Sequence, residues 1–104
     1  MKVILLCALG MSTSLLVENM KKAANEQGIE VEVVAHSVDQ FEKYLSDADV
    51  MLLGPQIRYK YRSLSKAAEA ANVPLAVIDT LAYGMVDGHK VLKQATDLIK
   101  KKGN

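Results

Sequence analysis

VILLCALGMSTSLLVENM, residues 3–20, joins a short apolar run to a helical pattern through a small, hydroxyl-rich loop. The run at 3–6 is typical of a buried strand. Gly10 and the hydroxyl residues after it are typical of a turn that opens a helix, and Leu16, Met20 and Ala23 then recur on one helical face. The stretch therefore predicts a strand, a loop and a helix, with the single cysteine of the chain, Cys7, at the carboxyl end of the strand.

Similar units follow along the chain. Apolar segments at 2–6, 31–35, 50–53 and 75–78 predict four strands, and stretches of helical period separate them. The first helix is expected to stop at Gly28 and a shorter one to cover about 40–45. A third begins behind Pro55, with an apolar face of Ile57, Tyr61, Leu64, Ala68 and Ala71. The last enters at residue 87 or 88, and its apolar face is Val91, Ala95, Leu98 and Ile99.

This alternation predicts an α/β fold, an open doubly wound four-stranded parallel sheet in the order 2-1-3-4, flanked by helices. With that order the first strand lies inside the sheet, next to the point where the strand order reverses. Ligands of such sheets bind there, outside the carboxyl ends of the strands. The topology therefore places Cys7 at the expected binding edge.

Size and composition narrow the class of protein. A chain of 104 residues with a net charge of +1 is expected to form a single domain, 1–104, without a nucleic-acid footprint. No apolar run is long enough to cross a bilayer, so a cytoplasmic location without membrane insertion is expected. One cysteine forms neither an internal disulfide nor a cysteine-rich zinc site, and no metal or cofactor is expected. The basic run at 100–102 is interpreted as the solvated end of a helix.

The loop after Cys7 has features of an anion-binding site. Its backbone N–H groups and the unpaired donors of the helix start converge, and no Asp or Glu precedes Glu18 to neutralise them. The same field favours the thiolate of Cys7, which suggests attack on phosphorus and a phosphocysteine. The alternative without a functional role is that Cys7 packs in the core as a small apolar residue and that the loop simply leads into the helix.

Two known loops provide comparisons. The loop lacks the GK[ST] of a Walker A motif. It resembles the cysteine loop of low-molecular-weight tyrosine phosphatases, Cys, five residues, then Arg, but Thr13 stands where that arginine would be. Without the guanidinium clamp on the transferring phosphoryl group, rapid hydrolysis is not expected. A cysteine phosphatase or arsenate-reductase-like protein, and a flavodoxin-like binding module with an inert Cys7, remain the alternatives.

Other polar residues are interpreted conservatively. Gln56 lies on the predicted rim, and a glutamine in the first turn of a helix is more often solvated than bound to a ligand. Asp79 and Asp87 are better explained as helix caps than as catalytic acids. Tyr83 either roofs the site or packs its ring. His36 and His89 have no partners at metal-ligand spacing and are assigned surface or structural roles.

Three apolar residues at the loop, Leu9, Met11 and Leu15, lie off the buried face of the first helix. Exposed together, they would form a patch for a transient partner. Simple packing beneath the loop explains them equally well. Both interpretations stay open from the sequence alone.

The motifs CALGMSTSLLVENM, ADVMLLGPQIRY and VIDTLAYGMVDGHKVLKQA cover nearly the whole chain with colinear spacing. Together they resemble the enzyme IIB components of the lactose/cellobiose (diacetylchitobiose) class of the bacterial phosphoenolpyruvate-dependent sugar phosphotransferase system. The resemblance implies a phosphocarrier whose cysteine takes a phosphoryl group from a phosphohistidine of enzyme IIA. It then passes the group to a β-disaccharide of cellobiose, lactose or chitobiose type, bound by the membrane component IIC.

Carried over, Cys7 is the nucleophile and the transient phosphocysteine. The implied phosphate-binding residues are Ala8, Leu9, Gly10, Met11, Ser12, Thr13 and Ser14. The absent arginine agrees with a carrier, because a phosphocysteine that waits for a second partner should resist attack by water. The implied partners are the IIA protein and the membrane IIC protein with its sugar.

Overall fold

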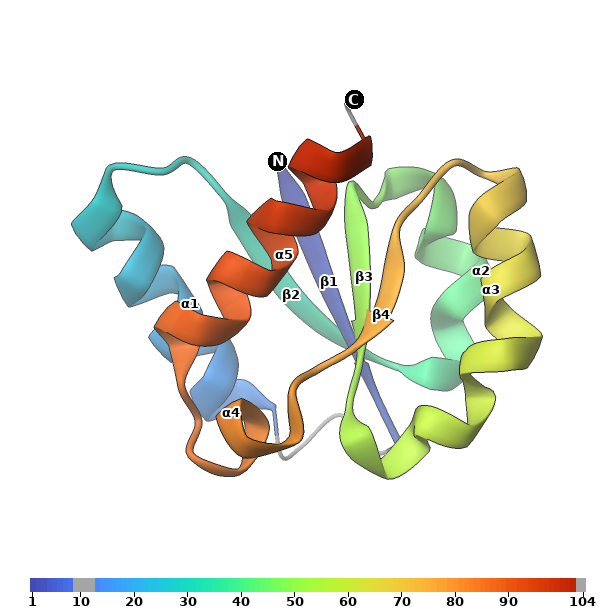
Figure 1. Ribbon diagram of the computed structural model, residues 1–104, viewed down its shortest axis with the longest axis horizontal. Helices are drawn as coiled ribbons and strands as arrows, with labels where there is room; N and C mark the ends of the chain where they lie inside the picture. Colours follow the sequence, from blue (N-terminus) through green and yellow to red (C-terminus); the bar gives the residue numbers. More distant parts are fainter. Residues whose placement is uncertain (9–12, 103–104) are drawn as a thin grey trace.

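The computed structural model describes residues 1–8 and 13–102 of the chain (Figure 1). Strands and helices alternate, and several short 3-10 helices (η) lie between them. In chain order the elements are β1 (Lys2–Cys7), α1 (Ser14–Gln27), β2 (Glu32–Ser37), η1 (Val38–Gln40), α2 (Phe41–Tyr44), η2 (Leu45–Asp47), β3 (Val50–Leu53), η3 (Pro55–Lys60), α3 (Tyr61–Ala70), β4 (Leu75–Val77), α4 (Thr80–Gly84) and α5 (Gly88–Lys102).

The four strands form one parallel sheet in the order β2-β1-β3-β4, which confirms the predicted fold class and strand order. Leu6 of β1 pairs with Leu53 of β3, and Cys7 pairs with Ser37 of β2. The carboxyl ends of the two inner strands and of β2 therefore meet at one edge, and Cys7 lies at that edge.

Helices cover both faces of the sheet, as its nearly continuous apolar strands require. In Figure 1, α1, α4 and α5 lie on one side and α2 and α3 on the other. Alternate residues of β1 supply the two cores: Val3 and Leu5 point to the first side, Ile4 and Leu6 to the second. The first core also holds Leu16, Met20, Ala23, Val91, Leu92 and Ala95, and the second Phe41, Met51, Leu53, Ile57 and Ala68.

Helix α1 ends as its sequence predicts. Gly28 adopts a left-handed conformation, with φ of 67°, which glycine tolerates without a steric penalty. Its N–H bonds back to the carbonyls of Ala24 and Asn25, and the N–H of Ile29 bonds to Ala24 at 2.9 Å. These bonds satisfy the last carbonyls of the helix and turn the chain toward β2.

The segment behind Pro55 differs from its prediction. Pro55 opens a 3-10 helix rather than an α-helix, Ile57 departs from helical dihedrals, and α3 begins only at Tyr61. The kink shifts the phase of the later helix relative to Ile57. Ile57 and Ala68 are buried as expected, but Tyr61 and Ala71 are exposed, so the predicted apolar face was wrong at those two positions.

Other boundaries moved by smaller amounts. β2 extends to Ser37 rather than ending at residue 35, and β4 ends at Val77, one residue before the predicted end. The short helix expected at 40–45 is divided into η1, α2 and η2.

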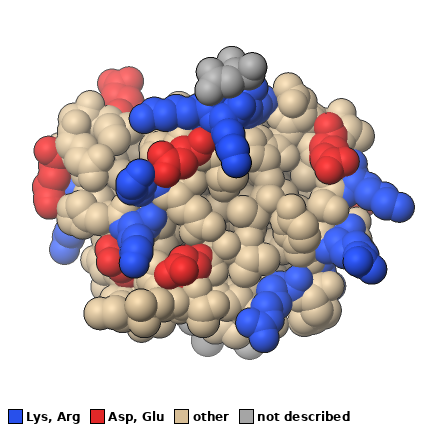
Figure 2. All heavy atoms as spheres, in the orientation of Figure 1, with Lys and Arg blue, Asp and Glu red and all other residues tan. Residues whose placement is uncertain are grey.

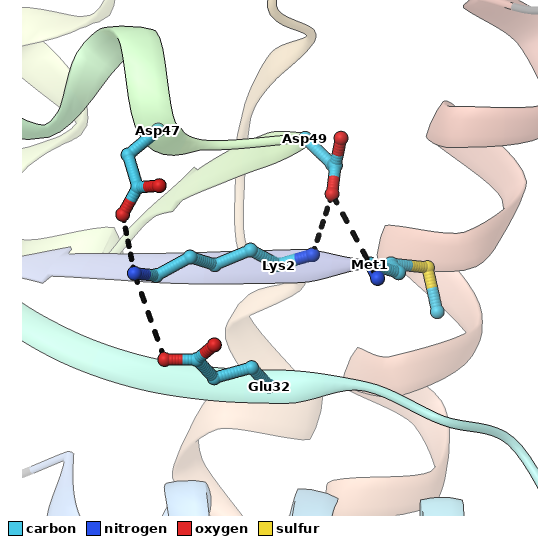
Figure 3. Close-up of polar contacts among 5 residues, drawn as sticks. All are labelled: Met1, Lys2, Glu32, Asp47 and Asp49. Carbon is cyan, nitrogen blue, oxygen red and sulfur yellow. Dashed lines mark hydrogen bonds and ion pairs between the residues drawn. The ribbon is translucent and has the colours of Figure 1, made fainter.

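The amino end of β1 carries a cluster of charges (Figure 3). The ammonium of Lys2 bonds to Asp47 and lies 3.6 Å from Glu32, and the backbone N–H of Lys2 donates to Asp49 at 2.6 Å. The hydrogen bond to Asp47 raises the pKa of Lys2 above its ordinary value. These contacts tie β1 to β2 and to the start of β3, at the end of β1 opposite Cys7.

Candidate functional site

Cys7 is the last residue of β1, and its side chain is 3% exposed. Its Sγ lies 3.7 Å from Oγ1 of Thr13 and donates a weak hydrogen bond to the backbone carbonyl of His36, at 3.8 Å. The thiol is thus held between the β2 strand end and the residue that precedes α1. Two polar contacts at sulfur distinguish this position from that of a purely apolar core cysteine.

Thr13 occupies the N-cap position of α1 without using its side chain as a cap. Its carbonyl accepts the first helical hydrogen bond, from the N–H of Val17 at 2.9 Å, while its fully buried hydroxyl lies beside Cys7. A threonine at an N-cap ordinarily turns its oxygen to the helix N–H groups. Here it faces the sulfur instead, and the N–H groups of the first turn do not use the Thr13 hydroxyl.

The start of α1 is free of negative side chains, because its first turn contains no Asp or Glu. The positive end of the helix dipole therefore faces the Cys7 edge without a carboxylate to offset it. Of the predicted phosphate-binding residues, Ala8 and Ser14 are exposed at the two ends of the loop and Thr13 is buried. Leu9, Gly10, Met11 and Ser12 lie outside the described residues.

The segment after β3 adjoins the end of β1. The N–H of Gly54 donates to the carbonyl of Leu6 at 2.8 Å, so η3 begins beside the residue that precedes Cys7. A Cβ on Gly54 would lie 3.5 Å from that carbonyl and 3.8 Å from the ring of Tyr83. This close approach brings β1, the start of η3 and α4 together, so the site includes more than the cysteine loop.

A pocket of about 600 Å³ opens between η3 and α4. Its lining residues are Pro55, Gln56, Arg58, Tyr59, Thr80, Tyr83 and Gly84. Gln56 and Tyr83, both weighed from the sequence, therefore share one pocket. Arg58 and Tyr59 were not singled out there; their position just after the rim residues Pro55 and Gln56 was the signal that could have found them.

Asp79 and Asp87 are helix caps, as predicted. A carboxylate oxygen of Asp79 accepts from the N–H of Ala82 at 2.9 Å, and one of Asp87 accepts from the N–H of Lys90 at 3.1 Å. Gln94 holds the segment between β4 and α4, because its side-chain oxygen accepts a hydrogen bond from the N–H of Asp79 and its amide nitrogen donates one to the carbonyl of Val77. Both carboxylates thus have structural partners at the ends of α4 and α5.

The two histidines also have structural partners. The ring of His36 stacks on Tyr44, with 3.7 Å between centroids and an interplanar angle of 3°. Burial, with a smaller effect of Lys2 and Lys43, lowers the pKa of His36. His89 lies 3.5 Å from a carboxylate oxygen of Glu26 on α1. Within residues 1–8 and 13–102, no three His, Cys, Asp or Glu side chains are arranged to hold a metal ion.

Apolar side chains are exposed near the site. Leu15, the second residue of α1, is 59% exposed, and two residues at α4, Leu81 and Met85, are 63% and 70% exposed. Figure 1 places α4 beside the first half of α1, and Asn19 of α1 donates to the carbonyl of Val86 at 2.9 Å. Of the predicted patch, Leu15 is exposed, while Leu9 and Met11 fall in the part that the structure does not describe.

The basic run and the membrane-span expectation can also be compared with the structure. The lysines at 100–102 lie in the last turn of α5, where cations complement the helix dipole. No helix among the described residues combines the length and apolar character needed to span a membrane.

Comparisons with known proteins converge on one family. The family model described as "PTS system, Lactose/Cellobiose specific IIB subunit" matches residues 2–94. An oligo-beta-mannoside-specific EIIB component of Bacillus subtilis is 43% identical over 94% of this chain and 95% of its own length. A galactose-specific EIIB component of Lactococcus lactis is 45% identical over 91% of this chain and 93% of its own. The solution structure of a cellobiose-specific IIB component from Borrelia burgdorferi superposes with a TM-score of 0.83, at 32% identity, over 98% of this chain and 94% of that one.

Proposed function

Because the chain belongs to the lactose/cellobiose-specific IIB subunit family of the sugar phosphotransferase system, we propose that Cys7 is its phosphoryl acceptor. The protein is a phosphotransferase component for sugar import. Cys7 would carry the phosphoryl group between two partners as a phosphocysteine. Transfer through a covalent intermediate divides one exchange between two proteins into two separate steps.

In the first step the sulfur of Cys7 attacks the phosphorus of a phosphohistidine on enzyme IIA. The P–N bond breaks and an S–P bond forms; the histidine nitrogen keeps the electron pair of the broken bond, and the thiol proton passes to solvent. In the second step a hydroxyl of the sugar bound by IIC attacks the phosphorus. An O–P bond forms and the S–P bond breaks; the cysteine sulfur keeps the electron pair as a thiolate, and the hydroxyl proton passes to solvent.

The observation that carries the proposal is the pairing of Cys7 with Thr13. The buried Thr13 hydroxyl lies 3.7 Å from the sulfur, next to a helix start that has no acidic side chain in its first turn. A hydroxyl donor and the positive end of a helix suit a dianion attached to that sulfur. Backbone N–H groups between Ala8 and Ser14 would complete the phosphate loop.

Thr13 also favours a carrier over a phosphatase. A phosphatase loop places a guanidinium over the phosphoryl group to stabilise the charge that develops during hydrolysis. Thr13 supplies one neutral hydroxyl at the corresponding place and leaves the phosphocysteine less activated toward water. The phosphate would then remain on Cys7 until a partner arrives.

The sugar is proposed by class, a β-linked disaccharide of the cellobiose, lactose or chitobiose type. The two relatives, at 43% and 45% identity, are named for an oligo-β-mannoside and for galactose. Relatives of nearly equal identity to this chain are thus named for different sugars, so identity at this level does not single out one sugar, which fits a selection made by the membrane component IIC. A carrier that meets a IIA protein and the inner side of IIC would work in the cytoplasm.

Intact-mass spectrometry tests this function directly. The purified protein is incubated with phosphoenolpyruvate, the general transfer proteins of the system and its cognate IIA protein. We expect one added phosphoryl group, mapped to Cys7, in the wild type and none in Cys7→Ser with an unchanged circular dichroism spectrum. Modification elsewhere, or none in the wild type, would refute the proposal. Steady release of inorganic phosphate would indicate a phosphatase instead.

A further inference from the structure

The segment from η3 into α3 carries positive charge without any acidic residue. Four cationic side chains, Arg58, Lys60, Arg62 and Lys66, occur between Asp49 and Glu69 with no acidic residue among them. Figure 2 shows blue spheres and no red ones over η3 and the adjoining half of α3. We call these four residues the basic surface. In a chain whose net charge is +1, they form a local excess that the rest of the molecule offsets.

The basic surface is not used for internal ion pairs. Within the described part of the chain, none of its four cations lies within ion-pair distance of a carboxylate. By contrast, Lys2 and Lys93 each form ion pairs with nearby carboxylates. Arg58, Arg62 and Lys66 are exposed. Arg62 and Lys66 are four residues apart on α3, a spacing at which like charges slightly destabilise a helix. The spacing of these two cations therefore does not stabilise α3.

The basic surface is continuous with the Cys7 edge. Gly54, which precedes η3, is hydrogen-bonded to Leu6, and Arg58 and the 73% exposed Tyr59 line the pocket that η3 shares with α4. A partner molecule that covers this pocket and reaches the end of β1 would also contact the cations of η3. Charge on this side of the molecule can therefore act on whatever approaches Cys7.

We propose that the basic surface is the docking site for an acidic face of the protein that delivers the phosphoryl group to Cys7. This inference rests on the proposed function. A soluble donor finds Cys7 by diffusion, and a field of one sign around a target raises the association rate and suppresses wrong partners. The pocket of Gln56, Arg58 and Tyr59 would receive side chains of that protein, which favours a protein face over a flat lipid surface.

Charge reversal tests the proposal. The test variant is Arg58→Glu with Arg62→Glu and Lys66→Glu; the matched control is Lys21→Glu with Lys22→Glu and Lys100→Glu, exposed positions on α1 and α5. Each set replaces three cations with three anions, a change of six charge units from +1 to −5. Circular dichroism and thermal unfolding establish that both variants fold. Both sets are made with Cys7→Ser, so that binding is measured without transfer.

Calorimetric titration with the cognate IIA protein is done at low and at high NaCl concentration. We expect the test variant to bind about tenfold or more weakly at low salt and the control about as well as the parent. High salt should weaken the parent, because it screens the attraction, and strengthen the test variant, because it screens the repulsion between the new glutamates and the acidic face. Equal affinity of test variant and control, or no affinity of the parent for IIA, would overturn the inference. The inference would also be overturned if the parent bound vesicles of phosphatidylglycerol and the test variant, but not the control, lost that binding while it still bound IIA normally.

The mass of wild-type Cys7 protein after incubation with phosphorylated IIA separates this inference from the proposed function. Salt-dependent IIA binding without any phosphate on Cys7 would support docking and refute the carrier role. Full and equally rapid phosphorylation of the test variant, made with Cys7 intact, would support the carrier role and refute docking on the basic surface.

Discussion

The sulfur of Cys7 and the hydroxyl of Thr13 lie 3.7 Å apart inside the protein, although five residues separate them in the chain. β1 ends at Cys7 and α1 starts after Thr13, so these two side chains lie at the end of one element and just before the start of the next. The Thr13 side chain makes no cap to the helix, and its hydroxyl lies beside the sulfur, next to any group that the sulfur carries. This relationship yields the first prediction.

Thr13→Val keeps the shape of the side chain and removes its hydroxyl. A hydrogen bond to a charged group contributes about 1.5–3 kcal/mol, so phosphoryl transfer to Cys7 should slow about tenfold or more. The rate is measured by quenched-flow mixing with phosphorylated IIA and intact-mass detection. Thr13→Ser is the control, because it keeps the hydroxyl and should remain within a few fold of wild type. Equal rates for the valine and serine variants would exclude a role for the hydroxyl.

The contact of α5 with α1 yields a prediction on stability. A Cβ on Gly88 would collide with the backbone of Asn19 and Met20, whereas a Cβ on Gly84 meets nothing within 4 Å. Gly88→Ala must separate the two helices and should cost about 1–3 kcal/mol or more of unfolding free energy. Gly84→Ala should cost nothing and can add a few tenths of a kcal/mol by restricting the unfolded chain. Urea denaturation measures both; a tolerated Gly88→Ala would show that the helices slide apart freely.

His36 yields a prediction on pH. Burial lowers its pKa below the ordinary 6.5, so near that pH the unfolded chain binds more protons than the folded one. Stability is therefore full above about pH 6.5 and falls as the pH drops from there toward the folded-state pKa. His36→Phe keeps a ring on Tyr44 and removes the titration, and should flatten this decline below about pH 6.5 in urea denaturation. A decline of unchanged slope in the variant would assign it to other groups.

Much of the fold could be predicted from local pattern. Strand order 2-1-3-4 followed from alternating apolar and helical segments and the handedness of crossovers, and Gly28 ended α1 for the backbone reason that made it a stop signal. Asp79 and Asp87 cap helices because each short carboxylate precedes a helix start. These features depend on residues close together in the chain, which is why a single sequence reveals them.

Features that depend on distant residues were less accessible. The 3-10 geometry after Pro55 changes the helix phase, so the periodic pattern alone misplaced Tyr61 and Ala71. The pocket containing Arg58 and Tyr59 requires η3 and α4 to meet, and that contact depends on the close approach of Tyr83 to Gly54. Sequence reasoning identified Thr13 by a missing arginine, but only the fold brings its hydroxyl to the sulfur.

The exposed leucine at the start of α1 provides the last prediction. Leu15 is 59% exposed one residue after the helix begins, and together with the exposed Leu81 and Met85 at α4 it is a candidate contact for a partner that approaches Cys7. Leu15→Asp should slow phosphoryl transfer from IIA severalfold or more, because it removes apolar surface from the contact and adds a carboxylate to the otherwise acid-free first turn of α1. It should leave the unfolding free energy nearly unchanged, because the side chain already faces solvent.

Asn25→Asp is the control, since it adds the same charge at an exposed position nearly three turns further along α1. The two variants are compared by initial transfer rate over a range of IIA concentrations. A docking defect raises the IIA concentration needed for half-maximal rate and leaves the maximal rate almost unaltered. An unchanged concentration dependence for Leu15→Asp would mean that Leu15 is exposed without taking part in docking. A lowered maximal rate alone would mean that the substitution disturbs the neighbouring Ser14 and Thr13 rather than the encounter with the partner.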